Sequence, residues 1–246
     1  MLSAASATAE IPLADRRSDA VLLAPETRAM QDDDTANPGM LSVLEGEDLW
    51  MAAPSPGGRS CQACHGDPRL SMRGVAARYP AWSEAKAAPI DLSGQINFCR
   101  ESRQALTPLP AESRELLGLT AFVAHPSRGL PIAPPADARL SDARERGRAL
   151  FTRRIGQLNL SCAACHDDNW GKRLAGAPIP QAHPVGYPIY RLEWQSIGSL
   201  QRRFRNCLTG VRAEPYPFGA PELVELEAYL MERAAGLAIE TPAVRP

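Results

Sequence analysis

The chain has few aromatic residues, no long apolar run and no excess of charge of either sign. Phe, Trp and Tyr make up 6% of its 246 residues, so its cores are expected to be modest unless a bulky apolar group helps to fill them. No apolar run approaches the ~18–20 residues of a membrane span, so no span is predicted. With 27 Lys and Arg against 28 Asp and Glu, no basic patch indicates nucleic acid or an anionic membrane as a partner.

What the sequence does contain is six cysteines, four of them in two Cys-x-x-Cys-His motifs. This pattern is typical of covalent haem c attachment, because two thiols one helical turn apart can add to the two vinyl groups of a porphyrin. The histidine then lies beneath the iron. A redox dithiol or a zinc site is the alternative, but no further ligands follow at zinc-finger spacing. The motifs therefore predict two covalently attached haems c, bound through Cys61, Cys64, His65, Cys162, Cys165 and His166.

The predicted haems also bear on where the protein works. Haem is ordinarily attached to such motifs outside the bacterial cytoplasm, so we expect an exported, periplasmic protein. The start of the chain, Met1 to Glu10, lacks the basic region followed by an apolar stretch that marks an export signal. We therefore expect the chain to be the mature form, from which the signal peptide is absent.

The sequence repeats itself with a period of about a hundred residues. Gly46–Trp50 and Gly147–Phe151 each begin fifteen residues before the first cysteine of a motif. Downstream, residues 115–123 match residues 222–230 without a gap, with apolar residues at helical spacing. Each unit runs helix, haem motif, long irregular loop, single cysteine and final helix, which resembles the small cytochrome c fold used twice.

This organisation predicts an all-α protein of two tandem cytochrome c-like domains with long irregular loops and an N-terminal extension. Residues 1–40 form the extension, which we expect to wrap the surface or to be partly disordered. The first domain is predicted at residues 41–130 and the second at residues 138–246. The boundary is expected in the proline-rich stretch 126–137.

The two remaining cysteines occupy matching places in the two units. Cys99 lies 34 residues after His65, and Cys207 lies 41 residues after His166. An iron that is bound by one histidine needs a second axial ligand, which cysteine can supply. We therefore expect Cys99 and Cys207 to be those ligands. A thiolate ligand lowers the reduction potential of the iron, which argues against a simple electron shuttle.

Alternatives to this ligand assignment remain open. A disulfide between Cys99 and Cys207 would suit an exported protein, but matching positions of two repeats usually lie farther apart than the ~7 Å that a disulfide allows. The spare histidines, His125 and His183, occupy unrelated places in the two units. Met72 could serve the first haem, but no methionine stands between the second motif and the final helix.

The surroundings of the two single cysteines differ in charge. Four residues before the cysteine, the first unit has Gln95 and the second has Arg203, one helical turn away and able to face the sulfur. An arginine there would lower the pKa of the thiol and offer a planar fork to an oxyanion such as a sulfonate. We therefore expect Arg203 to bind an anionic substrate next to Cys207.

Other arginines lie close by in the sequence. Arg202, Arg205 and Arg212 could pair with haem propionates or form a solvated face. Arg233, on the final helix, is a weaker candidate for a substrate contact.

The chain resembles the SoxA family, the larger cytochrome subunits of the SoxAX complexes of bacterial sulfur oxidation. The resemblance runs from about Asp48 to Leu230. It rests on the two haem motifs, on Cys99, and on the segment Arg203–Cys207 followed by Gly210 and Arg212. Single-haem members of the family lack the first haem, whereas this sequence retains that motif.

The resemblance implies an L-cysteine S-thiosulfotransferase, which joins thiosulfate oxidatively to a cysteine of the carrier SoxYZ while two electrons leave one at a time. A single-haem cytochrome, SoxX, would be the partner in a heterodimer. The resemblance also implies that Cys207 ligates the catalytic haem of the second domain, is often a persulfide and takes the sulfane group into covalent linkage. It further implies that Arg203 binds the substrate. Cys99 is then expected to be a ligand only.

Two other functions compete with this one. A di-haem cytochrome c peroxidase also has two cytochrome c domains, but it needs one haem with an exchangeable site, and the paired cysteines speak against that. A plain electron-transfer cytochrome would have no chemistry of its own. It would keep its function without Arg203.

Overall fold

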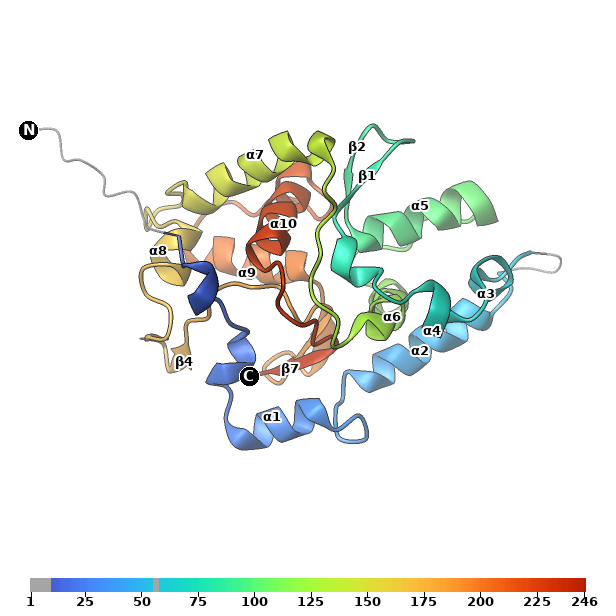
Figure 1. Cartoon of the computed structure of the whole chain (residues 1–246), viewed down its shortest axis with the longest axis horizontal. Helices are drawn as coiled ribbons and strands as arrows, with labels where there is room; N and C mark the ends of the chain where they lie inside the picture. Colours follow the sequence, from blue (N-terminus) through green and yellow to red (C-terminus); the bar gives the residue numbers. More distant parts are fainter. Residues whose placement is uncertain (1–9, 55–57) are drawn as a thin grey trace, which may run out of the picture.

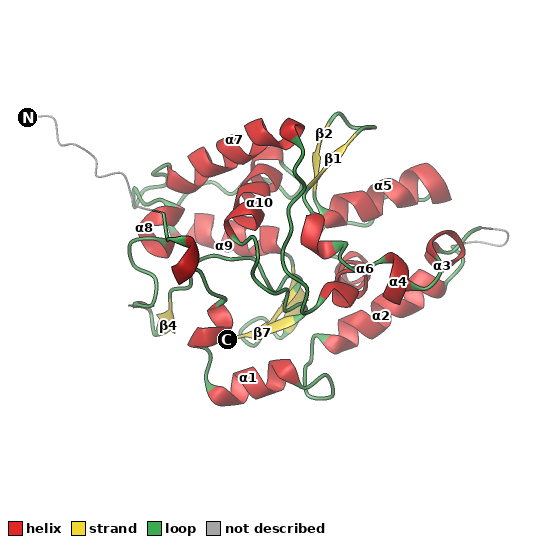
Figure 2. Ribbon diagram, viewed as in Figure 1, coloured by secondary structure: helices red, strands yellow, loops and turns green. Residues whose placement is uncertain are grey.

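The structure is a computed structural model that describes residues 10–54 and 58–246. Helices dominate it and the strands are short (Figures 1 and 2), which confirms the predicted all-α class. The α-helices are α1 (Pro25–Asp32), α2 (Met40–Met51), α3 (Cys61–His65), α4 (Pro68–Ser71), α5 (Leu92–Gln104), α6 (Arg114–Ala124), α7 (Ser141–Thr152), α8 (Cys162–His166), α9 (Leu200–Gly210) and α10 (Pro221–Arg233). The strands are β1 (Ala81–Ser83), β2 (Ala88–Ile90), β3 (Arg173–Leu174), β4 (Ala177–Pro178), β5 (Ile189–Arg191), β6 (Ser196–Gly198) and β7 (Ala243–Arg245). Five 3-10 helices complete the described elements: η1 (Leu13–Asp15), η2 (Asp19–Leu22), η3 (Ala76–Arg78), η4 (His125–Ser127) and η5 (Ala138–Leu140).

A pair of crossing helices forms the base of each unit. In the first unit α2 packs against α6, and in the second α7 packs against α10. The crossings are close because a glycine stands at each contact. A side chain at Gly46 would collide with the backbone of Gly118, and one at Gly147 would collide with the carbonyl of Glu225. This explains the two matching glycines that precede the haem motifs.

A hairpin leads into the helix that carries each single cysteine. In the first unit β1 pairs with β2, and in the second β5 pairs with β6, both antiparallel. Each following helix begins with a side-chain cap: Asp91 accepts a hydrogen bond from the Gly94 amide (2.7 Å), and Ser199 accepts one from the Arg202 amide (3.1 Å). The caps fix the start of α5 and α9 at matching places, so Cys99 and Cys207 occur at equivalent positions.

Separate apolar clusters fill the two units, and a third joins them. The first cluster gathers around Trp50 and Phe122, and the second around Phe151 and Leu223. The third takes Ala77 from the first unit, Ile132 from the connecting stretch, and Val185, Met231, Ala234 and Ile239 from the second. The connecting stretch is therefore packed between the units rather than loose.

The N-terminal segment wraps the second unit. Its backbone amide at Arg17 donates to the side chain of Gln181 (2.9 Å), and Asp19 pairs with Arg245 (2.6 Å). Helix α1 packs against β7, which pairs in parallel with β5. Of the expected extension, residues 1–9 lie outside the described residues, and the remainder wraps the surface as expected. None of the described helices is long and apolar enough to span a membrane.

Candidate functional site

The second Cys-x-x-Cys-His motif forms the short helix α8. Ser161 caps it by accepting a hydrogen bond from the Ala164 amide (3.1 Å). One turn of helix places Cys162 and Cys165 on the same side, with His166 directly after them. Phe151 of α7 is almost fully buried and belongs to the same apolar cluster as Ala163. The motif is thus held against the core of its unit.

Cys207 lies on α9 and lines a cavity that His166 also lines. Burial, and then the charge of Cys207, raise the pKa of Cys162 to about 12 and raise the pKa of Cys165 as well. A charge that acts on both thiols lies close to them. Helices α8 and α9 therefore place His166 and Cys207 on one cavity, with the thiols of Cys162 and Cys165 near Cys207 but outside the residues that line it.

The donor set of this cavity fits a c-type haem. The Nδ1 of His166 lies 2.7 Å from the backbone carbonyl of Pro180. Since a carbonyl can only accept, Nδ1 carries the proton and Nε2 keeps a free lone pair, which is the arrangement that metal-binding histidines adopt. Burial also lowers the pKa of His166 to about 4, so the ring stays neutral. His166 and Cys207 could then supply the two axial ligands, and Cys162 and Cys165 the thioether bonds.

Arg203 also lines this cavity, one helical turn before Cys207. Its guanidinium makes no hydrogen bond and no ion pair with any described residue. Burial lowers its pKa, but nearby acidic groups, Cys207 foremost, outweigh that effect, and the pKa lies above its usual value. A half-buried, unpaired guanidinium beside a sulfur is suited to bind an oxyanion.

The other arginines that the sequence singled out lie outside this cavity. Arg202 stacks on Trp194, with its guanidinium 4.1 Å from the ring centroid. Arg205 donates to the carbonyl of Tyr216, and Arg212 is exposed in the turn after α9. Arg233 is buried in an ion pair with Asp167 and makes no contribution to the cavity wall.

The first Cys-x-x-Cys-His motif forms α3 and is more open. Cys61 is partly buried, whereas Cys64 and His65 are exposed. The ring of Trp50 lies 5.4 Å from that of His65. Burial raises the pKa of Cys61, and the charge of Cys99 on α5 raises it further. The first motif and its single cysteine are therefore also neighbours, so the residues again fit a haem bound between them.

The polar neighbours of the two single cysteines differ as the sequence indicated. In the first unit the side-chain amide of Gln95 donates to the sulfur of Cys99 (3.4 Å). In the second unit the equivalent position is the unpaired Arg203. A neutral amide that is already bound to the sulfur offers no charge to an anion, so of these two equivalent positions Arg203 is the one suited to bind an anion.

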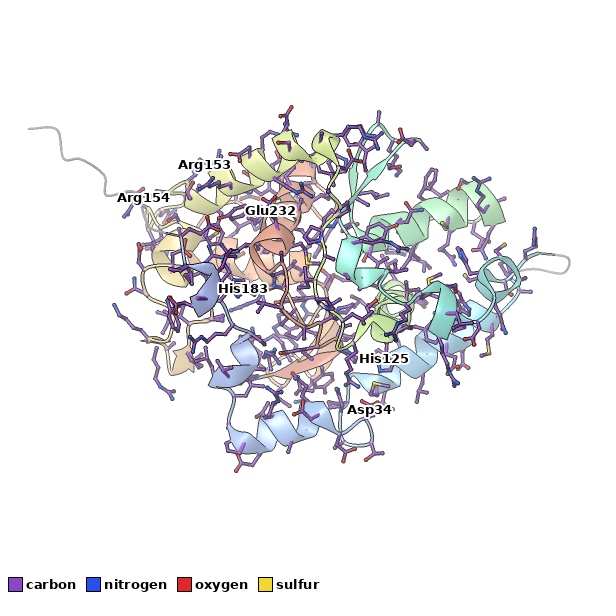
Figure 3. All side chains as sticks on the ribbon, viewed as in Figure 1. Asp34, His125, Arg153, Arg154, His183 and Glu232 are labelled. Atoms are coloured by element: carbon purple, nitrogen blue, oxygen red, sulfur yellow. The ribbon has the colours of Figure 1, made fainter. Side chains whose placement is uncertain are left out.

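Of the alternative ligands that the sequence offered, His183 lines the Cys207 cavity, whereas His125 and Met72 do not. His125 follows α6 and His183 lies in the second unit, far from it in the chain (Figure 3). His183 is buried and lines the Cys207 cavity. Its Nδ1 is hydrogen-bonded to the Arg17 carbonyl (2.9 Å), as that of His166 is to the Pro180 carbonyl, and its Nε2 has no partner among the described residues, so His183 stays open as an alternative ligand. Met72 is buried in the apolar cluster of the first unit. All six cysteines are unpaired, so Cys99 and Cys207 form no disulfide here.

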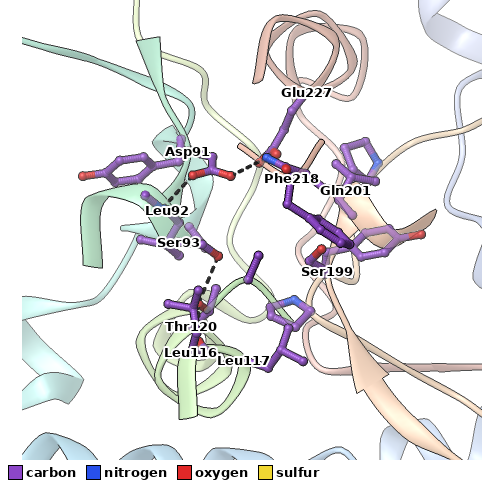
Figure 4. A pocket seen from close by; sticks show the side chains of 18 of the residues that line it. Asp91, Leu92, Ser93, Leu116, Leu117, Thr120, Ser199, Gln201, Phe218 and Glu227 are labelled. Carbon is purple, nitrogen blue, oxygen red and sulfur yellow. Dashed lines mark hydrogen bonds between the residues drawn. The ribbon is translucent and has the colours of Figure 1, made fainter. Parts of the chain in front are cut away.

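A larger cavity lies between the units (Figure 4). Asp91 receives a hydrogen bond from Gln201 of the other unit (2.8 Å), and Glu227 of α10 also lines the cavity. Burial raises the pKa of both carboxyl groups, and Asp91 raises that of Glu227 further. No Arg, Lys or His of the described chain lines this cavity.

Sequence reasoning missed several residues of the Cys207 cavity, among them Tyr187, Arg191 and Asp19. A signal for the first two was present, because Tyr79–Cys99 and Tyr187–Cys207 are of equal length and align without a gap. Asp19 reaches the cavity only because the N-terminal segment wraps the second unit, and no local pattern predicts that.

This chain matches a known protein family along most of its length. A family model described as the SoxA/TsdA cytochrome c domain matches residues 45–132 and again residues 146–239, which confirms two tandem cytochrome c-like units. An L-cysteine S-thiosulfotransferase subunit SoxA of Pseudaminobacter salicylatoxidans is 37% identical over 100% of this chain and 86% of its own length. The SoxA of Rhodovulum sulfidophilum is 33% identical over 95% of this chain and 83% of its own length.

A solved structure agrees with these relatives. The crystal structure of SoxXA from P. pantotrophus superimposes with a TM-score of 0.89 and 31% identity, and the match covers 93% of this chain and 86% of that one. The fold, the repeated family match and the identity over the full chain agree, and the chain belongs to the SoxA/TsdA cytochrome c family as a member of its SoxA group.

Proposed function

We propose that this chain is the catalytic cytochrome subunit of an L-cysteine S-thiosulfotransferase, which joins thiosulfate to a cysteine of the carrier SoxY. One observation carries the proposal: an unpaired Arg203 lies beside Cys207 in a cavity that His166 also lines. Among the relatives, the proteins named for this activity match this chain over nearly its whole length.

The protein binds covalent haem c, as the family implies. We propose two haems. His166 and Cys207 would be the axial ligands of the second, and Cys162 and Cys165 would carry its thioether bonds. For the first, the corresponding residues would be His65, Cys99, Cys61 and Cys64. When bound, haem c supplies a one-electron acceptor.

The chemistry that we assign to the chain has two steps. Arg203 holds the sulfonate of thiosulfate through charge-assisted hydrogen bonds, and the outer sulfur of thiosulfate forms a bond with the sulfur of Cys207 while two electrons leave one at a time. The carrier cysteine, as a thiolate, then attacks the sulfane sulfur that is bonded to Cys207. The Cys207 thiolate leaves, so this second step needs no oxidant.

The partners and the place of action follow from the same proposal. The structure that this chain matches bears the name SoxXA, and we infer a heterodimer with a single-haem SoxX. The carrier SoxYZ and thiosulfate are the proposed substrates, and the periplasm is the proposed location. We further propose residues 1–40 as an extension, 41–130 as the first domain and 138–246 as the domain with the active-site haem.

The test compares Cys207→Ala with Cys99→Ala in the complex with SoxX. Thiosulfate-dependent reduction of the cytochrome and the mass of the carrier are measured, after absorption spectra have confirmed both haems in each variant. We expect Cys207→Ala to abolish the thiosulfate adduct on the carrier, and Cys99→Ala to retain it. Equal loss in both variants would contradict the assignment of Cys207 as the reacting sulfur.

A further inference from the structure

The two hairpin-and-helix segments of the chain can be compared position by position. Tyr79–Cys99 and Tyr187–Cys207 align without a gap, and both fold as a hairpin followed by a capped helix. Positions at which the two segments carry different residue types therefore indicate a role that is present in the second unit and absent from the first.

Four arginines of the second segment stand where the first has neutral residues. Arg191, Arg202, Arg203 and Arg205 replace Ser83, Gly94, Gln95 and Asn97. Of the four, only Arg191 and Arg203 line the cavity of Cys207. The asymmetry that points to Arg203 therefore applies equally to Arg191, which comes from a different element, the strand β5.

Arg191 is held in place by three contacts. Its Nε donates to the carbonyl of Pro246 (2.9 Å), its Nη2 lies 3.2 Å from the carboxylate of Glu193, and its guanidinium lies over the ring of Trp194. The parallel pairing of β5 with β7 brings the Pro246 carbonyl into reach. The side chain is 13% exposed. Its Nη1 has no partner among the described residues, so a fixed guanidinium keeps one free edge.

Within the cavity lining, Arg191 and Arg203 have no acidic partner of their own, since Glu193, which pairs with Arg191, does not line the cavity. Arg245 also lines the cavity, but Asp19 (2.6 Å) and Glu240 (2.7 Å) neutralise it. Burial, and then the positive charge of Arg203, lower the pKa of Arg191. Two guanidinium groups that repel each other in a partly buried cavity are stabilised by an anion bound between them.

We propose that Arg191 is a second binding residue for the sulfonate of thiosulfate, which then lies between Arg191 and Arg203 with its outer sulfur directed at Cys207. This rests on the proposed function. A sulfonate has three equivalent oxygens, so two guanidinium groups from different elements can each take an oxygen and fix its orientation. Arg203 alone would leave the anion free to rotate about one contact.

The experiment uses the holoprotein in complex with SoxX and compares Arg191→Gln with Arg191→Lys and with the control Arg202→Gln. Arg202 is a neighbouring arginine that does not line the cavity. We expect Arg191→Gln to raise the KM for thiosulfate roughly 10- to 100-fold, the loss of one charge-assisted contact, with kcat within about twofold. Arg191→Lys should recover part of the loss, and Arg202→Gln should behave as the unaltered protein.

A second readout needs no turnover. Sulfate is an unreactive oxyanion, and its inhibition constant against thiosulfate should rise by a similar factor in Arg191→Gln. If neither the KM for thiosulfate nor the inhibition constant of sulfate changes, the proposal is overturned. If the reduction potential of the haem shifts and these two constants do not, Arg191 binds a haem propionate. If Arg191→Gln does not bind haem, the KM of Arg191→Lys for thiosulfate tests the proposal in its place: a raised KM supports it and an unchanged KM overturns it. Absence of thiosulfate turnover in the unaltered complex would instead refute the proposed function.

Discussion

Arg233 and Asp167 form a buried ion pair one residue beyond His166, with side chains that are 0% and 4% exposed. The pair links the last turn of α10 to the end of α8. Arg233→Met would leave the Asp167 carboxylate buried without a partner. We expect a loss of about 3–5 kcal/mol in the free energy of unfolding, measured by denaturant titration of the holoprotein.

Arg146→Met is the matched control. Arg146 of α7 pairs with Glu225 of α10 at 2.7 Å, but the side chain of Arg146 is 57% exposed. Such surface pairs contribute about 0–1 kcal/mol. Similar losses in the free energy of unfolding of the two variants would show that the buried Arg233 pair contributes no more to stability than the exposed Arg146 pair.

Gly147→Ala should destabilise the second unit. The added methyl group would meet the carbonyl of Glu225 at the crossing of α7 and α10, and neither backbone can move without separating the helices. We expect a loss of about 1–3 kcal/mol in the free energy of unfolding, together with weaker haem retention in the second unit. Gly210→Ala is the control, because nothing lies within 4 Å of the added atom, and it should be close to neutral.

Glu227→Gln should make the protein more stable at neutral pH and flatten its stability profile. Burial, and then Asp91, hold the pKa of Glu227 well above its ordinary 4.5. The folded protein therefore keeps a proton that the unfolded chain has lost, so the free energy of unfolding falls as the pH rises above about 4.5. Asp91 and Glu112 are the other acids on this cavity, with Tyr79 and Tyr187. The arginines of α7 beside α10 pair with Glu225 and Glu232 instead.

The measurement is denaturant unfolding at several pH values between 4 and 9. Glu232→Gln is the control on the same helix, because Glu232 is 53% exposed and lies outside the cavity. A Glu227→Gln profile parallel to that of the unaltered protein would mean that Glu227 ionises normally in the folded state.

Arg203→Gln should lower kcat/KM for thiosulfate by about 100-fold, the effect of one lost charge-assisted contact to an anion in a partly buried site. Both haems and the fold should be retained, because the guanidinium of Arg203 makes no hydrogen bond or ion pair with a described residue. Arg205→Gln, on the same helix but outside the cavity, is the control for the loss of an arginine. Full turnover without Arg203 would favour a plain electron-transfer role.

Sequence reasoning predicted the features that depend on short, local sequence motifs. Two haem motifs, the glycines before them and the matched single cysteines all appear in the predicted order, because local chemistry sets their spacing. The close helix crossing explains why Gly46 and Gly147 match. In the structure the contrast between Gln95 and Arg203 is one between a bound amide and an unpaired guanidinium, and the role of Arg203 stays a prediction.

The features that it missed depend on contacts between distant segments. Arg191 is fixed by β7, more than fifty residues later in the chain. The acids Asp91 and Glu227 meet only when the two units pack together. Asp19 reaches the cavity through the wrapped N-terminal segment. Sequence periodicity does not predict these long-range contacts, because they depend on tertiary packing.

The long sequence separation between the N-terminal segment and strand β7 also predicts the order in which parts of the Cys207 cavity form during folding. Asp19 and Arg245, 226 residues apart, meet at the Cys207 cavity, and contacts of such long sequence separation form late in folding because closing a long loop is entropically costly. Helix α8 depends on local interactions, which form faster. We therefore expect the two distant segments to close over the cavity after the motif Cys162–His166 has taken its place.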